Sequence, residues 1–194
     1  MSFIENLDRS LLLFINQNLA NSVFDAILPN ITDLHKTDGF RFYFAPFLAL
    51  LIIYFYRSLG AFLLSGLAIS LSISDWTGSL AKHYFQRPRP FNAGMDLIQR
   101  SGAGGFSFPS NHSVNMFCAA FFLSTFFPRA RWYLLFFAGL IAFSRVYDGV
   151  HYPTDVLAGA FWGSSVGILG AHLTKKIYHK FLHTLKVRKN QSHV

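Results

Sequence analysis

Three short polar blocks interrupt an otherwise apolar chain. They are Lys82 with Arg89-Pro90 following it, then Pro109-Ser110-Asn111-His112, and then Ser144-Arg145 followed by His151 and Asp155. Lysine, arginine and imidazole side chains in one set can bind a phosphate group and transfer it. Each block lies at the edge of a long apolar run, so we expect the side chains to converge on one face of a helix bundle. A phosphorylated lipid suits such a site.

The second block predicts an anion site at the start of a helix. Ser110 comes immediately before an apolar run, near a helix N-cap, where free backbone N–H groups and the helix dipole attract an anion. His112 then lies in the first turn. Lys82 and Arg89 add fixed positive charge, and Arg145 adds a planar donor that can bind two phosphate oxygens.

The third block pairs an imidazole with a carboxylate. His151 and Asp155 are four residues apart, and Pro153 between them suits the first turn of a helix. A carboxylate there can orient the imidazole and stabilise its charged form. Taken singly, each residue can be an interfacial side chain or a cap. Together they indicate function, because an ionisable group inside a bilayer costs about 2.5 to 3.5 kcal/mol.

The composition indicates a membrane protein that forms one domain over residues 1–194. Apolar residues make up 52% of the chain, with 23 Phe, and charged residues reach 13%, against about 25% in soluble domains. A helix needs about 17 to 25 apolar residues to cross the bilayer. Runs of this kind predict five spans, at residues 42–56, 61–80, 113–127, 132–143 (extending to 147) and 156–173. Residues 86–110, with their prolines and glycines, predict a loop.

The N-terminal segment, residues 1–35, has a different pattern. Ile4, Leu7, Leu11 and Phe14 recur at helical spacing among polar residues, which favours an amphipathic helix in the membrane interface over a sixth span. The segment does not show the positively charged start or the small-residue cleavage site that are typical of a secretory leader. The expected fold is therefore all-α: a polytopic bundle of about five transmembrane helices plus one interfacial helix, with six spans as the alternative.

Basic residues outside the blocks predict the orientation in the membrane. Nine of them fall on one side of the five predicted spans: Arg57, Arg129, Arg131, Lys175, Lys176, Lys180, Lys186, Arg188 and Lys189. That side, including the basic tail 175–194, should be cytoplasmic. The polar blocks then face the periplasm or the exterior of a bacterial inner membrane. A basic tail beside an anionic leaflet explains the net charge of +8 without nucleic acid.

Neither a disulfide nor a cofactor is predicted. Cys118 is the single cysteine and lies in an apolar run, which is typical of packing. The chain offers no dense set of Asp and Glu for Mg²⁺. A zinc site at His112 and His151 is a minor alternative.

In these three blocks the sequence resembles the type 2 phosphatidic acid phosphatase family, integral-membrane lipid phosphatases that share a helical core with vanadium haloperoxidases. The blocks follow in the family's order over residues 82–155. The resemblance implies that His151 is the nucleophile, Asp155 its partner and His112 the acid that protonates the leaving group. It also implies a phosphate cradle of Lys82, Arg89, Ser110 and Arg145, beside Asn111, which stands where many members have Gly.

The reaction so implied runs through a phosphohistidine without a metal. The short chain resembles small bacterial members that act on undecaprenyl pyrophosphate. Phosphatidylglycerophosphate, phosphatidic acid and lipid A 1-phosphate remain alternatives. Arg87, Arg100 and Asn92 lie in the long loop, where they can bind a second phosphate or a head group. Two other classes stay open: a haloperoxidase-like protein that holds vanadate, and a lipid transporter without catalysis. The oligomeric state is not predicted.

Overall fold

The computed structural model describes residues 3–34 and 37–191, and most of them are helical. The helices are α1 (Phe3–Leu13), α2 (Ser22–Asp33), α3 (Ala45–Phe85), α4 (Asn111–Phe126), α5 (Arg131–Tyr147) and α6 (Pro153–Gln191). π-helical turns at Phe14–Asn18 and Gly39–Phe44 and 3-10 turns at Pro90–Asn92 and Pro128–Ala130 lie between or beside them. The described residues contain no strand, so the predicted all-α class is confirmed.

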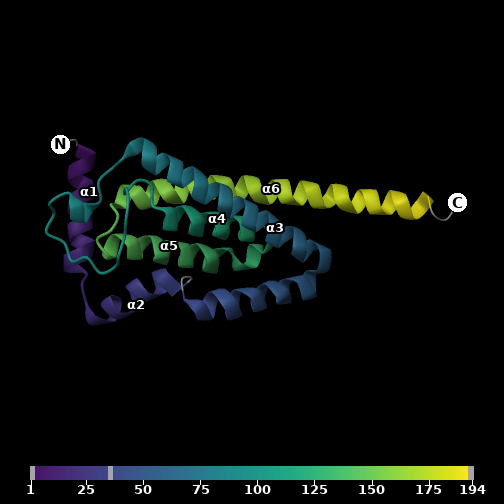
Figure 1. Cartoon of the computed structure of the whole chain (residues 1–194), viewed down its shortest axis with the longest axis horizontal. Helices are drawn as coiled ribbons and strands as arrows, with labels where there is room; N and C mark the ends of the chain where they lie inside the picture. The colour runs from purple at the N-terminus through teal and green to yellow at the C-terminus, as the bar shows by residue number, and fades with distance from the viewer. Residues whose placement is uncertain (1–2, 35–36, 192–194) are drawn as a thin grey trace.

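Helices α3, α4, α5 and α6 form the bundle, and α6 packs along both α3 and α4 (Figure 1). The approach of α6 to α4 depends on glycine. A Cβ atom at Gly163 would lie 1.9 Å from the carbonyl oxygen of Val114, so a larger residue would force the helices apart. Cys118 is free and buried in α4, in agreement with a packing role.

Helix α3 is two arms joined by a sharp bend, as the two predicted apolar runs require. The backbone at Arg57 is non-helical, with φ 49° and ψ −123°. Figure 1 shows the chain turning back at this bend, so that the two arms run in opposite directions. A Cβ atom at Gly60 would lie 2.5 Å from the carbonyl oxygen of Ile52, a contact between residues eight apart that a straight helix cannot make.

The apolar helices identify an integral membrane protein, but the number of spans stays a prediction. Within the described residues, Gly39–Asn92 and Pro153–Val187 are long and apolar enough to cross a bilayer. A third span is added if the bent pair Phe3–Asn18 and Ser22–Asp33 counts as one. The predicted spans in α4 and α5 are short, at 16 and 17 residues, close to the lower limit for crossing the membrane.

The N-terminal segment differs from the single amphipathic helix that we expected. Its two helices meet at 116°, and α1 lies across the end of the bundle where α6 begins (Figure 1). Asp8, Leu12 and Asn16, four residues apart, form one buried row. Apolar side chains elsewhere on α1 are exposed, with Ile4 64% and Leu7 48% accessible. The carboxylate of Asp8 therefore faces the protein, and an interfacial location of the helix stays a prediction.

Candidate active site

Hydrogen bonds join the three polar blocks at the end of the bundle where α1 lies. Lys82, in the last turn of α3, donates to the carbonyl oxygen of Pro109 at 2.6 Å. The backbone N–H of Ser110 donates to the carbonyl oxygen of Asp155 at 3.0 Å. Arg89 Nη1 lies 3.2 Å from His151 Nε2. The three blocks, although spread over residues 82 to 155, therefore meet in one site.

His151 is held in the tautomer that a nucleophile needs. Its Nδ1 lies 3.4 Å from Asp155 Oδ2, and its Nε2 faces Arg89. Arginine only donates hydrogen bonds, so Nε2 is the acceptor and the ring proton sits on Nδ1, toward Asp155. Burial lowers the pKa of His151 from 6.5 to about 4, although the Asp155 carboxylate opposes that shift. At neutral pH the ring is uncharged, with a lone pair on Nε2.

Asp155 is fixed by more donors than the sequence indicated. It lies in the first turn of α6, which begins at Pro153 as predicted, with a side chain that is 0% exposed. Its Oδ1 accepts Arg87 Nη1 at 2.6 Å, and its Oδ2 accepts the backbone N–H of Tyr152 at 2.9 Å and the hydroxyl of Ser107. These bonds leave the carboxylate little freedom to turn away from His151.

Lys82 and Arg89 hold the loop between α3 and α4 as well as supplying charge. The Lys82 ammonium donates to three carbonyl oxygens, of Phe106 (3.0 Å), Ser107 (3.2 Å) and Pro109 (2.6 Å). Arg89 donates to the carbonyl oxygens of Gly104 (2.8 Å), Gly105 (3.1 Å) and Val150 (2.9 Å). An ammonium has three donors. A phosphate would therefore meet Lys82 mainly as a nearby charge.

Two members of the predicted phosphate cradle each have an open donor. Within the part of the chain that the structure describes, Ser110 Oγ and Arg145 Nε are buried and have no hydrogen-bond partner. Ser110 is the N-cap residue of α4, as predicted, yet its hydroxyl makes no cap bond. Arg145 Nη1 lies 3.3 Å from Ser101 Oγ and 3.5 Å from Asp148 Oδ2. Buried polar groups normally find partners, and an oxyanion would satisfy both atoms.

His112 and Asn111, in the first turn of α4, lie in different surroundings from those of His151. The His112 side chain is 24% exposed, and its Nε2 lies 3.9 Å from Asp33 Oδ1 at the end of α2. The amide of Asn111 donates to Asp75 Oδ1 at 3.2 Å and Ser79 Oγ at 3.1 Å, both on α3. This side chain joins two helices, so the predicted contact of Asn111 with phosphate finds no support.

The two loop arginines that were predicted to bind a second phosphate are engaged with carboxylates. Arg87 bridges Asp8 and Asp155 at 2.6 Å each. Arg100 Nε lies 2.5 Å from Asp25 Oδ1, and its guanidinium stacks 4.2 Å from the centroid of the Tyr147 ring. Both arginines therefore tie the loop to the N-terminal helices and the bundle.

Sequence reasoning missed Asp8 and Ser107. A signal for Asp8 was present: it lies midway between Ile4 and Leu12, four residues from each, and so on the apolar stripe of its helix. A carboxylate on such a stripe requires a buried partner. Ser107 carried no signal, because the fold of an irregular loop brings its hydroxyl to Asp155.

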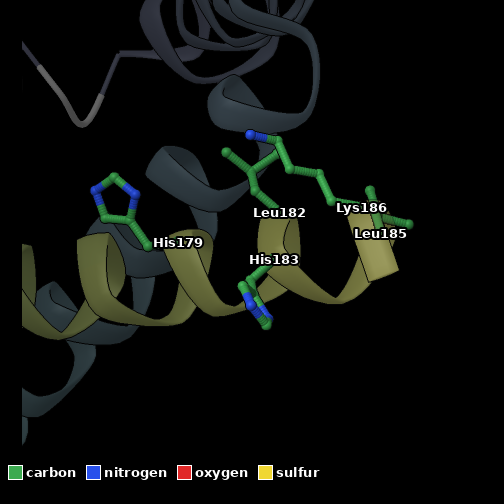
Figure 2. Close-up of a pocket in the computed structure, with 5 residues that line it drawn as sticks. All are labelled: His179, Leu182, His183, Leu185 and Lys186. Atoms are coloured by element: carbon green, nitrogen blue, oxygen red, sulfur yellow. The ribbon is translucent and has the colours of Figure 1, made fainter. Parts of the chain in front are cut away.

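No second site of comparable chemistry stands out. A hollow of about 400 Å³ on the far half of α6 is lined by His179, Leu182, His183, Leu185 and Lys186. Figure 2 shows the two imidazole rings turned to different sides of the helix, so they do not converge on one ligand. Among the described residues, no group of three or more His, Cys, Asp or Glu could hold a metal ion.

The sequence matches the PAP2 superfamily over residues 59–179, which is more than half of the chain and contains all three polar blocks. The chain therefore belongs to the PAP2 superfamily and is a phosphatase of that family. The predicted family and enzyme class are both confirmed.

Relatives whose names give different substrates resemble this chain. A lipid A 4'-phosphatase of Bacteroides thetaiotaomicron is 28% identical, over 91% of this chain and 81% of that protein. An undecaprenyl-diphosphatase of Sulfolobus acidocaldarius is 33% identical, over 55% of this chain and 53% of that protein, so the match spans about half of its length. The structure of a transmembrane PAP2-type phosphatidylglycerolphosphate phosphatase from Bacillus subtilis has a TM-score of 0.66 and 26% identity, covering 93% of this chain and 88% of that one.

Proposed function

We propose that this phosphatase hydrolyses a phosphorylated membrane lipid without a metal, with His151 as nucleophile. The observation that carries the proposal is the state of His151: a buried, neutral ring whose Nδ1 proton faces Asp155 and whose Nε2 faces the arginine side. The open donors on Ser110 and Arg145 add binding capacity for the phosphoryl oxygens.

The reaction has two steps. In the first, the lone pair of His151 Nε2 forms a bond to phosphorus, the bond from phosphorus to the lipid oxygen breaks, and His112 gives a proton to that oxygen. Asp155 stabilises the positive charge on the ring. In the second, His112 takes a proton from water, the oxygen of that water bonds to phosphorus, and the P–N bond breaks. Inorganic phosphate leaves, and both histidines return to their starting states.

The extent of similarity favours a lipid A-type phosphate monoester as substrate. The similarity to the Bacteroides lipid A 4'-phosphatase covers 91% of this chain, whereas the undecaprenyl-diphosphatase match covers 55%. Arg87 and Arg100 are paired with carboxylates, which leaves them poorly placed to bind the second phosphate of a diphosphate. Undecaprenyl pyrophosphate, the substrate expected from the sequence, is the second candidate, because the relative from Sulfolobus acidocaldarius is an undecaprenyl-diphosphatase.

Phosphate release from purified protein tests these proposals. Lipid A bisphosphate, undecaprenyl pyrophosphate, phosphatidylglycerophosphate and phosphatidic acid would be compared in one detergent, with a chelator present. We expect release with a preference for lipid A bisphosphate, and inhibition by vanadate, which imitates the transferring phosphoryl group. Activity lost on chelation and restored by Mg²⁺ or Zn²⁺ would overturn the metal-free mechanism. Release from none of the lipids would favour a transporter.

The proposed site faces the periplasm or the exterior. The bend in α3 and the far half of α6, where many basic residues lie, are at the end of the molecule opposite α1 (Figure 1). Basic segments favour the cytoplasmic side. In a Cys118→Ser background, Gly102→Cys in the loop should react with an impermeant thiol reagent on intact cells or spheroplasts, and Thr184→Cys on α6 should not. The reverse pattern would place the site in the cytoplasm.

A further inference from the structure

One arginine connects the N-terminal helix to the carboxylate that backs His151. Asp8 Oδ2 on α1 lies 2.6 Å from Arg87 Nη2, and Asp155 Oδ1 lies 2.6 Å from Arg87 Nη1. The Asp8 and Asp155 side chains are 1% and 0% exposed. The guanidinium lies 3.9 Å from the centroid of the Tyr152 ring, which fixes its plane. A single planar cation therefore binds two buried carboxylates from opposite parts of the chain.

Asp8 also holds the start of α6. Its Oδ1 accepts the backbone N–H of Thr154 at 2.9 Å, and its Oδ2 accepts the Thr154 hydroxyl at 2.6 Å. The first N–H groups of a helix lack partners within the helix and are ordinarily capped by the residue before it. Here the acceptor comes from α1. Asp8 thus acts on Asp155 twice, through Arg87 and through the neighbouring residue.

We propose that Asp8 is a positioning residue for the phosphatase reaction, acting on His151 through Arg87 and Asp155. The proposal rests on the proposed role of His151. Two carboxylates share the charge of Arg87, so Asp155 keeps enough negative charge to stabilise the phosphohistidine cation. If the Asp8 charge were removed, Arg87 would act on Asp155 alone and oppose that cation. The superfamily match begins at residue 59, so this helix adds to the site from outside it.

The test uses the full chain in detergent with the best lipid substrate. Asp8→Asn keeps the shape of the side chain and removes its charge. We expect kcat to fall about 10- to 100-fold, as for other residues that orient a reacting group, with KM changed less than about twofold. The double variant with Arg87→Gln should lose clearly less than the two single losses combined, because Asp8 acts on Asp155 in part through that arginine.

Asp25→Asn is the matched control. It breaks another pair between an N-terminal helix and a loop arginine, Asp25 with Arg100. Among the described residues, neither member of this pair is hydrogen-bonded to the Asp155 side chain. Its kcat should stay within about twofold of wild type. A wild-type kcat for Asp8→Asn, an equal fall for Asp25→Asn, or a loss fully additive with that of Arg87→Gln would each overturn the inference.

Two further variants keep the outcomes distinct. If His151→Ala is inactive while Asp8→Asn turns over at the wild-type rate, only the inference fails. If His151→Ala keeps its turnover, the proposed function fails and takes the inference with it. Should Asp8→Asn not fold, Arg87→Lys replaces it, because an ammonium cannot bridge both carboxylates in the same plane. A wild-type kcat for Arg87→Lys would likewise overturn the inference.

Discussion

The two histidines of the site lie in contrasting surroundings. His151 is 3% exposed in its side chain, and hydrogen-bonding groups face both of its ring nitrogens. His112 is 24% exposed in its side chain, although its Nε2 atom is buried, and the nearby carboxylate of Asp33 is 3.9 Å away. One imidazole is enclosed and oriented; the other is partly exposed.

This difference matches the two proposed tasks. A nucleophile must keep one tautomer and one direction, and enclosure with fixed neighbours supplies both. An acid that protonates a leaving lipid oxygen and later activates water must exchange protons with water, so partial exposure suits it. The positions of the two rings thus separate the roles that their chemistry alone leaves interchangeable.

Removing the enclosed imidazole should have the largest effect. We expect His151→Ala to abolish phosphate release from lipid and aryl phosphates alike, because no neighbouring side chain offers an equivalent nucleophile. Turnover measured with folded, detergent-purified protein checks this. More than about a tenth of wild-type activity would exclude His151 as the nucleophile, since loss of acid–base help alone costs roughly 10² to 10⁴.

Removing the exposed imidazole should depend on the leaving group. We expect His112→Ala to lower kcat on a lipid phosphate by about 10²- to 10⁴-fold. The loss should be smaller on an aryl phosphate, whose oxygen needs less protonation. The ratio of the two losses is the measurement. Equal losses on both substrates would mean that His112 does not protonate the leaving group.

Removing one hydrogen bond that fixes Asp155 beside His151 should lower kcat less than removing either histidine. Ser107→Ala removes a hydroxyl that donates to Asp155 and lies 3.4 Å from His151 Nδ1. We expect kcat to fall about tenfold, because the lost interaction is one hydrogen bond to a charged group. Ser165→Ala, whose hydroxyl donates to the carbonyl oxygen of Phe161 in α6, is the control and should have no effect. Equal kcat values for the two variants would argue against a rigid Asp155.

Enclosure should also show as a pH effect on stability. The pKa of His151 is lowered by burial to about 4 in the folded protein, from an ordinary value of 6.5, so the unfolded chain takes up the proton first as the pH falls. Stability due to the neutral ring is complete above pH 6.5 and is lost toward pH 4. Between pH 7.5 and 5, wild type should lose about 2 kcal/mol more than His151→Gln. If the melting temperatures of the two proteins fell by the same amount between pH 7.5 and 5, burial of a neutral His151 ring would be contradicted.

The sequence by itself determined the class of fold, and it named most of the residues of the proposed site. Apolar runs separated by Arg57 and by the loop at 86–110 predicted the helices, because helix length in a bilayer is set by hydrocarbon thickness. The spacing of His151, Pro153 and Asp155 predicted the start of α6 and the pairing of the two side chains. These are local features, and neighbouring residues in the chain decide them.

Only the tertiary structure decided how the site is held. The loop places Ser107 on Asp155, the turn of α4 directs Asn111 to Asp75, and the crossing of α1 brings Asp8 to Arg87. Each contact joins residues more than thirty positions apart, and sequence spacing carries no information on such distances. Helical periodicity placed Asp8 on one stripe of its helix, but the packing of α1 against a loop about eighty residues further along the chain selected Arg87 as its partner.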